Sequence, residues 1–177
     1  MGKALPSPWL RGRIPGIPPL LQPVAHALVH SVENVEEALG ELPASRLWFQ
    51  LHGAASVGFH LRHLAGSTDR LFTYARGAEL TDEQTAALRA EQGQHGDLPA
   101  ASTLLENWKQ VVDRSLDQLR QTDESTLTDE RLVGRARLPS NVLGLLFHAA
   151  DHAARHTGQI VTTVRMINGA AIESDLT

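Results

Sequence analysis

The chain has 177 residues, of which 42% are apolar and 20% are charged, and its formal net charge is −4. These values indicate one globular domain with a substantial core, and the mild acidity without a Lys/Arg cluster argues against a nucleic-acid-binding surface. The chain has nine histidines and no cysteine. The lack of cysteine excludes a disulfide framework, and it excludes a thiolate of the chain's own as nucleophile or metal ligand.

The N-terminal segment, residues 1–19, is predicted to be an extended arm. It contains five prolines, which restrict the backbone and remove hydrogen-bond donors: Pro6, Pro8, Pro15, Pro18 and Pro19. Its apolar residues Trp9, Leu10 and Ile14 are candidates for docking on the body of the protein or on a partner. The segment lacks the apolar core of a signal peptide, and no apolar run approaches the ~20 residues of a membrane span. We therefore expect a cytoplasmic protein without membrane contact.

A first helix is predicted from about Leu20 to Gly40, because apolar residues recur there at helical spacing and glycine commonly follows a helix end. His26 and His30 lie on this helix four residues apart, so they form one candidate pair of metal ligands. Glutamates nearby favour a position for this pair on the polar flank of the helix.

A second helix is predicted to begin near Ser56 and to end before Gly77. Its apolar residues form one stripe at about 100° per residue. His60 falls within that stripe and His63 falls on its edge, so periodicity alone favours His60 as the inward-pointing histidine.

Two capping boxes predict the starts of the next two helices. Thr81 and Gln84 have the spacing that opens a short helix, which fades at Gly93, and Thr103 and Glu106 have the same spacing at the start of a third long helix. Residues 121–139 are polar and connect this helix to the last one. Four apolar residues in that connection indicate a crossover or a short extended piece: Leu127, Leu132, Val133 and Leu138.

The last helix, residues 141–168 with Ser140 as its predicted N-cap, carries the strongest chemical signal. His152 and His156 lie four residues apart within its apolar stripe, so their Cβ atoms are roughly 5–6 Å apart. An unpaired buried polar group costs about 1–3 kcal/mol, and a shared metal ion would occupy both rings. Zinc proteases use this spacing too, but Ala153 stands where they have the glutamate general base.

Four long amphipathic helices without a convincing alternating segment predict an all-α fold, a four-helix bundle. We expect the bundle to span residues 20–168, with the arm before it, a C-terminal tail at 169–177, and a short extra helix between the second and third long helices. The long connections leave room for crossovers, so a simple up-down-up-down order is not required.

Two segments carry a resemblance to a known family. ASVGFHLRHLAGSTDRLFTYARG in the second helix and LLFHAADHAARHTGQI in the last one resemble the DinB-like superfamily of DinB and YfiT-type metal-binding helical bundles. The resemblance extends from about Leu20 to Met166. It implies a four-helix bundle with a divalent metal ion, zinc or nickel, held by three histidines.

The resemblance assigns the three metal ligands as His63, His152 and His156. His63 matches because Leu64 and Ala65 follow it directly, as in the family pattern. This assignment differs from the periodicity ranking, which leaves His60 as the alternative or as a supporting residue. His148 continues the four-residue spacing and is a further candidate.

Characterised members of the superfamily include thiol transferases, a thiol-dependent isomerase and a hydrolase-like branch. The resemblance therefore implies a metal-dependent thiol S-transferase that activates a low-molecular-weight thiol toward an electrophile. The alternatives are a non-catalytic metal-binding stress or interaction protein and a metal-dependent hydrolase. We also expect a homodimer. Hydrolysis needs a carboxylate base, for which Asp69 and Asp151 are the candidates; Asp151 also suits a surface ion pair.

Overall fold

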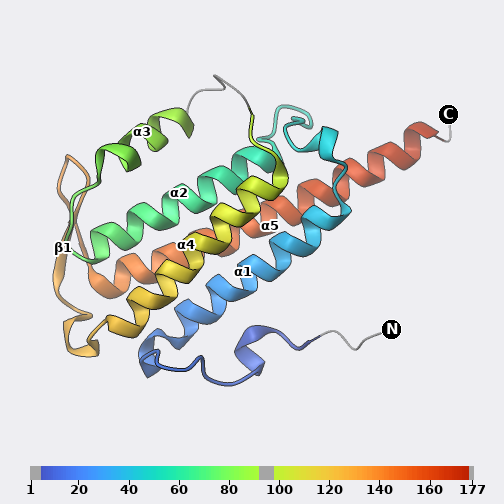
Figure 1. Cartoon of the computed structure of the whole chain (residues 1–177). Coiled ribbons are helices and arrows are strands. Elements are labelled where there is room, and N and C mark those ends of the chain that lie inside the picture. The colour runs from blue at the N-terminus through green and yellow to red at the C-terminus, as the bar shows by residue number, and fades with distance from the viewer. Residues whose placement is uncertain (1–4, 92–97, 176–177) are drawn as a thin grey trace.

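The computed structural model describes residues 5–91 and 98–175, with side chains described as far as residue 169. Four long helices pack side by side and a short helix, α3, lies along the outside of α2 (Figure 1). The helices are α1 (Gln22–Glu41), α2 (Val57–Ala75), α3 (Asp82–Glu91), α4 (Ala101–Gln121) and α5 (Val142–Asp175). The predicted all-α four-helix bundle with an extra short helix is thereby confirmed.

The bundle does not alternate in direction. In Figure 1, α1 and α5 run one way and α2 and α4 run the other way. Each of α1 and α2 packs against both α4 and α5, so α1 and α2 lie on opposite corners of the bundle. Because α2 and α4 are parallel, the connection between them must cross back over the length of the bundle, and α3 is part of that connection.

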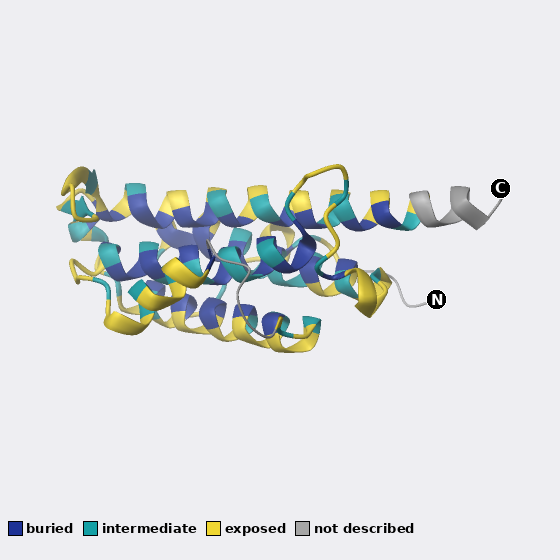
Figure 2. Ribbon diagram, turned by 90° about the horizontal axis from the view of Figure 1, so that it is seen from above, coloured by how far each residue is buried: buried dark blue, intermediate teal, exposed yellow. Residues whose placement is uncertain are grey.

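The core consists of the apolar stripes that the sequence predicts. Leu28, Leu64, Trp108 and Ile160, one from each long helix, are fully buried. In Figure 2 the buried positions of the long helices face inward and the exposed positions lie on the outer surface. Burial of each such side chain contributes about 1.5–3 kcal/mol, so packing rather than intrinsic helix propensity holds these elements together.

The helix starts agree with the sequence at one predicted capping box and differ at the other. The backbone N–H of Gln84 donates to Thr81 Oγ1 (3.2 Å), and the backbone N–H of Thr81 donates to Gln84 Oε1 (3.0 Å). These two bonds confirm the first capping box. The second box, at Thr103, is wrong, since α4 begins at Ala101. The extended backbone of Ala100 places the helix start earlier, so that Thr103 already lies in the first turn.

The connection before α5 contains a small β-hairpin. Strands β1 (Glu130–Val133) and β2 (Leu138–Asn141) pair antiparallel, with Arg131 opposite Ser140. Since Ser140 belongs to β2, the predicted N-cap is wrong; Asn141 caps α5 by accepting from the Gly144 amide through Oδ1 (2.7 Å). The hairpin is joined to the end of α2, because Arg131 Nε donates to the carbonyl oxygen of Ala75 (2.9 Å).

The N-terminal arm packs along α1. Arg11 forms an ion pair with Glu33 (2.5 Å), His26 Nε2 donates to the carbonyl oxygen of Gly12 (2.9 Å), and Ile17 is buried. Trp9, by contrast, has 63% of its surface exposed. The arm includes a 3-10 turn at Pro8–Leu10 and leads into another at Pro19–Leu21, and further turns of this type occur at Ala44–Arg46 and Glu124–Thr126.

One helix extends beyond its predicted boundary, and one predicted helix end is not described. Helix α5 continues to Asp175, into the segment 169–177 that we expected to be a tail. The predicted end of the short helix at Gly93 lies outside the described residues. No helix in the described part of the chain has the length and apolar character needed to cross a membrane.

Candidate metal centre

Three imidazoles from two helices come together on one side of the bundle. His63 of α2 and His152 and His156 of α5 each offer a ring nitrogen, and these nitrogens all lie within 4.8 Å of one another. The ring centroids are 4.4 Å apart for His152 and His156, 4.8 Å for His63 and His156, and 5.1 Å for His63 and His152. All three rings are partly exposed, so the cluster lies at the edge of the core.

The sequences of α2 and α5 bring these rings together. On α2, His60, His63 and Ser67 lie three or four residues apart, so they share the face of the helix that contacts α5 through His156 and His152. The spacing of four residues likewise places His152 and His156 on one face of α5.

His60 is buried beside the cluster. It has 7% of its surface exposed, its Nδ1 lies 3.0 Å from Nδ1 of His156, and its ring makes an edge-on contact with Phe59. Periodicity therefore identified His60 correctly as the inward-pointing histidine. The group of three potential ligands nevertheless contains His63, the residue on the edge of the stripe, because that edge faces α5 where the cluster is partly open to solvent.

Ser67, one turn after His63 on α2, holds the His152 ring. Its hydroxyl donates to the carbonyl oxygen of Leu64 (3.2 Å), and its oxygen lies 3.2 Å from His152 Nδ1. Since the hydroxyl proton is used by Leu64, the serine oxygen accepts from His152, whose proton must then be on Nδ1. The sequence gives no signal for this role, because serine is common on helices.

Glu91, the last residue of α3, holds the His63 ring. Its Oε2 lies 2.8 Å from His63 Nδ1, and Arg70 binds both carboxylate oxygens, at 2.6 and 3.1 Å. Burial raises the pKa of the Glu91 carboxyl, but hydrogen bonds from His63 and Arg70 and the charge of Arg70 outweigh burial and hold that pKa below its usual value. Sequence reasoning missed Glu91, because no pattern predicts where α3 docks.

Each ring of the cluster thus has its Nδ1 atom occupied by a protein partner: Glu91 for His63, Ser67 for His152 and His60 for His156. A ring that donates from Nδ1 leaves its other nitrogen, Nε2, for a metal ion, as His63 does toward Glu91 and His152 toward Ser67; His156 does the same when it is the donor to His60. Three imidazoles with fixed orientations suit zinc or nickel, and carboxylate-preferring ions such as Mg²⁺ or Ca²⁺ do not suit them. The chemistry of the donor set therefore fits a divalent transition-metal ion.

Burial also keeps the His152 and His156 rings neutral. It lowers the pKa of His152 to about 4, with smaller contributions from the charges of His63 and His148. Burial likewise lowers the pKa of His156 to about 4, with the neighbouring histidines adding to the shift. At neutral pH both rings therefore carry a free lone pair, which is the form that binds a metal.

The other predicted candidates lie outside this cluster. His148 is exposed, with its ring centroid 5.7 Å from that of His152, and His26 is hydrogen-bonded to the N-terminal arm. Asp151 forms a surface ion pair with Arg155 (2.7 Å), as expected. Asp69 accepts from Gln84 at 2.6 Å. Neither aspartate that we considered as a base is free.

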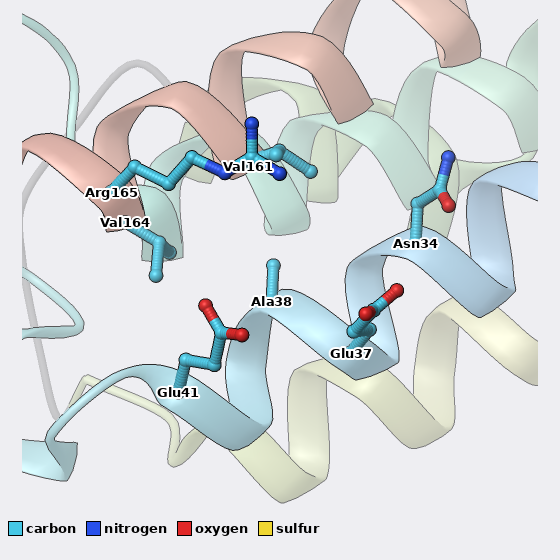
Figure 3. Close-up of a pocket in the computed structure, with 7 residues that line it drawn as sticks. All are labelled: Asn34, Glu37, Ala38, Glu41, Val161, Val164 and Arg165. Carbon is cyan, nitrogen blue, oxygen red and sulfur yellow. The ribbon is translucent and has the colours of Figure 1, made fainter. Parts of the chain in front are cut away.

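A separate cavity of about 200 Å³ lies between α1 and the C-terminal half of α5 (Figure 3). Glu37 and Glu41 of α1 and Arg165 of α5 contribute its charged lining. None of the three clustered histidines lines it. The histidine centre is therefore distinct from this cavity.

The fold and the site together define a class of protein, a helical bundle with a three-histidine cluster that can hold a metal ion. The sequence profile of the DinB superfamily matches residues 27–160. The chain therefore belongs to the DinB superfamily, as the resemblance in α2 and α5 predicted.

Solved structures of bacterial proteins share the fold. A conserved protein from Enterococcus faecalis is 18% identical with a TM-score of 0.65, and the match covers 84% of this chain and 97% of that one. An uncharacterised protein from Escherichia coli UTI89 is 12% identical (TM-score 0.60; 86% and 96% covered), and a protein from Streptococcus pneumoniae is 9% identical (TM-score 0.59; 82% and 88% covered). At these identities the likeness concerns the fold alone. No curated protein matches the sequence.

Proposed function

We propose that this protein holds a divalent metal ion, zinc or nickel, through His63, His152 and His156, and that it is a metal-dependent thiol S-transferase. The observation that carries the proposal is the convergence of three partly exposed imidazoles, each of which has its Nδ1 atom hydrogen-bonded to a protein group. Three protein ligands are typical of catalytic zinc sites, in which the remaining position is open to a substrate, whereas structural sites are closed by four.

The bound ion would supply the positive charge that converts a coordinated thiol into a nucleophilic thiolate at neutral pH. The chain has no cysteine, so the thiol must be an exogenous small molecule. The residues of the chain hold the imidazoles in fixed orientations and keep one side of the cluster accessible. The exposed fraction of the His63 side chain, 25%, supports access for a small thiol and its electrophilic partner.

The engaged carboxylates argue against the hydrolytic alternative. A metal-dependent hydrolase commonly uses a carboxylate near the ion as general base. Here Glu91 is bound by Arg70 and His63, Asp151 by Arg155, and Asp69 by Gln84. Thiol transfer needs no such base, because the metal charge itself favours the thiolate.

The proposal is tested by measuring conjugation of low-molecular-weight thiols with a chromogenic electrophile, using protein loaded with zinc or nickel. The wild type is compared with His152→Ala and with His148→Ala, which changes an exposed histidine outside the cluster. We expect a metal-dependent rate in the wild type and in His148→Ala, and a loss of roughly tenfold or more in His152→Ala, since a free thiol is only a few per cent ionised at pH 7. Equal rates for His152→Ala and the wild type would refute the transferase proposal and favour a non-catalytic metal-binding protein.

A further inference from the structure

The short helix α3 is held on α2 by two polar anchors. At its N-terminal end, Gln84 donates to Asp69 Oδ2 (2.6 Å) and to Thr73 Oγ1 (2.8 Å). At its C-terminal end, Glu91 reaches the histidine cluster through His63. Glu91 is the buried residue of this helix, which presents no fully buried apolar side chain to α2. A helix that buries a carboxylate in place of a leucine or valine is not docked there by hydrophobic packing alone.

Residues of α2 form the position in which the Glu91 carboxylate binds. Gly66 lies beneath it, and a Cβ atom at this position would collide with Glu91 Oε1 and with Arg70. Arg70 is itself buried, with 8% of its surface exposed, and forms a bidentate pair with the carboxylate. Gly66 leaves space for the carboxylate, and Arg70 holds both of its oxygens. Together these two residues determine which carboxylate lone pairs face His63.

This arrangement has a chemical consequence for the His63 ring. A carboxylate paired with arginine can only accept hydrogen bonds, so His63 must carry its proton on Nδ1. Nε2 of the same ring then has a free lone pair. In the other tautomer, Nδ1 and the carboxylate would present lone pairs to each other at 2.8 Å, which is repulsive.

We propose that Glu91 is a positioning residue of the histidine centre: with Arg70 and Gly66 it fixes the His63 tautomer that leaves Nε2 free for a cation. The inference rests on the metal site proposed above and adds a partner from α3, outside the four-helix core. Carboxylate–histidine–metal arrangements of this type contribute about 10–100-fold to metal affinity in other proteins.

The tautomer is tested first, in metal-free protein, by nitrogen NMR of the histidine rings in alkaline buffer. In the wild type we expect His63 to carry its proton on Nδ1. In Glu91→Gln, Arg70 needs the amide oxygen, so the amide NH₂ group faces His63, and we expect the proton to move to Nε2. A wild-type His63 protonated on Nε2, or the same tautomer in both proteins, would overturn the proposal.

Metal affinity is tested second, by competition for zinc with a chromophoric chelator. We expect Glu91→Gln to weaken zinc binding by about 10–100-fold. The matched control is Gln84→Ala, which removes the other anchor of α3 without touching His63, and it should stay within about twofold of the wild type. If both variants lost affinity equally, Glu91 would act only by docking α3, and the proposal would be wrong.

The two measurements separate this inference from the proposed function. If the wild type bound no zinc, the metal proposal would fail, while the tautomer comparison would still decide the action of Glu91 on His63. If zinc bound equally to the wild type and to Glu91→Gln, the positioning role would fail and the metal proposal would stand.

Discussion

Ser31 of α1 and Thr157 of α5 share a buried hydrogen bond, with 2.6 Å between their hydroxyl oxygens. The Thr157 hydroxyl donates to the carbonyl oxygen of Ala153 (2.8 Å), so Ser31 must be the donor to Thr157. This bond joins α1 to α5 at the residue that follows His156.

Replacing Ser31 by alanine should therefore lower the free energy of unfolding by about 1 kcal/mol, since a net intramolecular hydrogen bond contributes about that much. Denaturant unfolding measures the effect. Ser102→Ala, at an exposed position of α4, is the control and should stay within about 0.5 kcal/mol of the wild type. A neutral Ser31→Ala variant would show that the bond adds nothing to stability.

Gly58 near the start of α2 allows the Trp48 ring to lie against the helix. A Cβ atom at Gly58 would lie 2.7 Å from the indole ring, and the indole Nε1 donates to the carbonyl oxygen of Pro99 (3.1 Å). We expect Gly58→Ala to displace the indole, to destabilise the fold by about 1–3 kcal/mol as overpacking typically does, and to shift tryptophan fluorescence to the red.

A second helical glycine provides the matched control. A Cβ atom at Gly158 of α5 would meet no other atom within 4 Å. Because alanine favours a helix over glycine by about 1 kcal/mol, Gly158→Ala should raise the free energy of unfolding. If the two substitutions had the same effect, contact with Trp48 would not be the reason for glycine at position 58.

How far the sequence predicts this structure depends on the range of the interactions involved. The four long helices follow from local periodicity, and Leu28, Leu64, Trp108 and Ile160 are buried as their stripes predict. The predicted starts of α4 and α5 were wrong because the extended backbone of Ala100 and a strand pairing set them, and the pattern of apolar residues reveals neither.

In the candidate site, too, residues on regular helices could be predicted from sequence, whereas a residue brought in by long-range docking could not. The pair His152 and His156 follows from helical spacing, and the family pattern supplied His63 where periodicity ranked His60 first. Glu91 could not be found from sequence, because it reaches His63 only once α3 docks on α2. Long-range docking of a short polar helix leaves no periodic signal in the chain.

The partly buried His152 and His156 predict a pH dependence of stability for the metal-free protein. The pKa values of His152 and His156 are about 4 in the folded state, below the ordinary value of 6.5 that applies when the chain is unfolded. The unfolded chain therefore binds more protons between these values, so stability is complete above pH 6.5 and falls as the pH decreases toward 4. Denaturant unfolding between pH 7 and 5 measures this slope.

The contribution of these two rings is isolated by a variant. The double substitution His152→Gln with His156→Gln removes both titrating groups, so its stability should change less between pH 7 and 5 than that of the wild type. An equal slope in both proteins would assign the pH dependence to other residues.

Equilibrium zinc binding to protein prepared free of metal tests most directly whether imidazoles from α2 and α5 share one cation. We expect one ion per chain in the wild type. Replacing His63, His152 or His156 by alanine should lower the affinity by roughly 100-fold or more, which exceeds the loss expected when only a hydrogen-bond partner of a ligand is removed. His30→Ala on α1 should bind as the wild type does. Unchanged affinity in all three cluster variants would contradict the account.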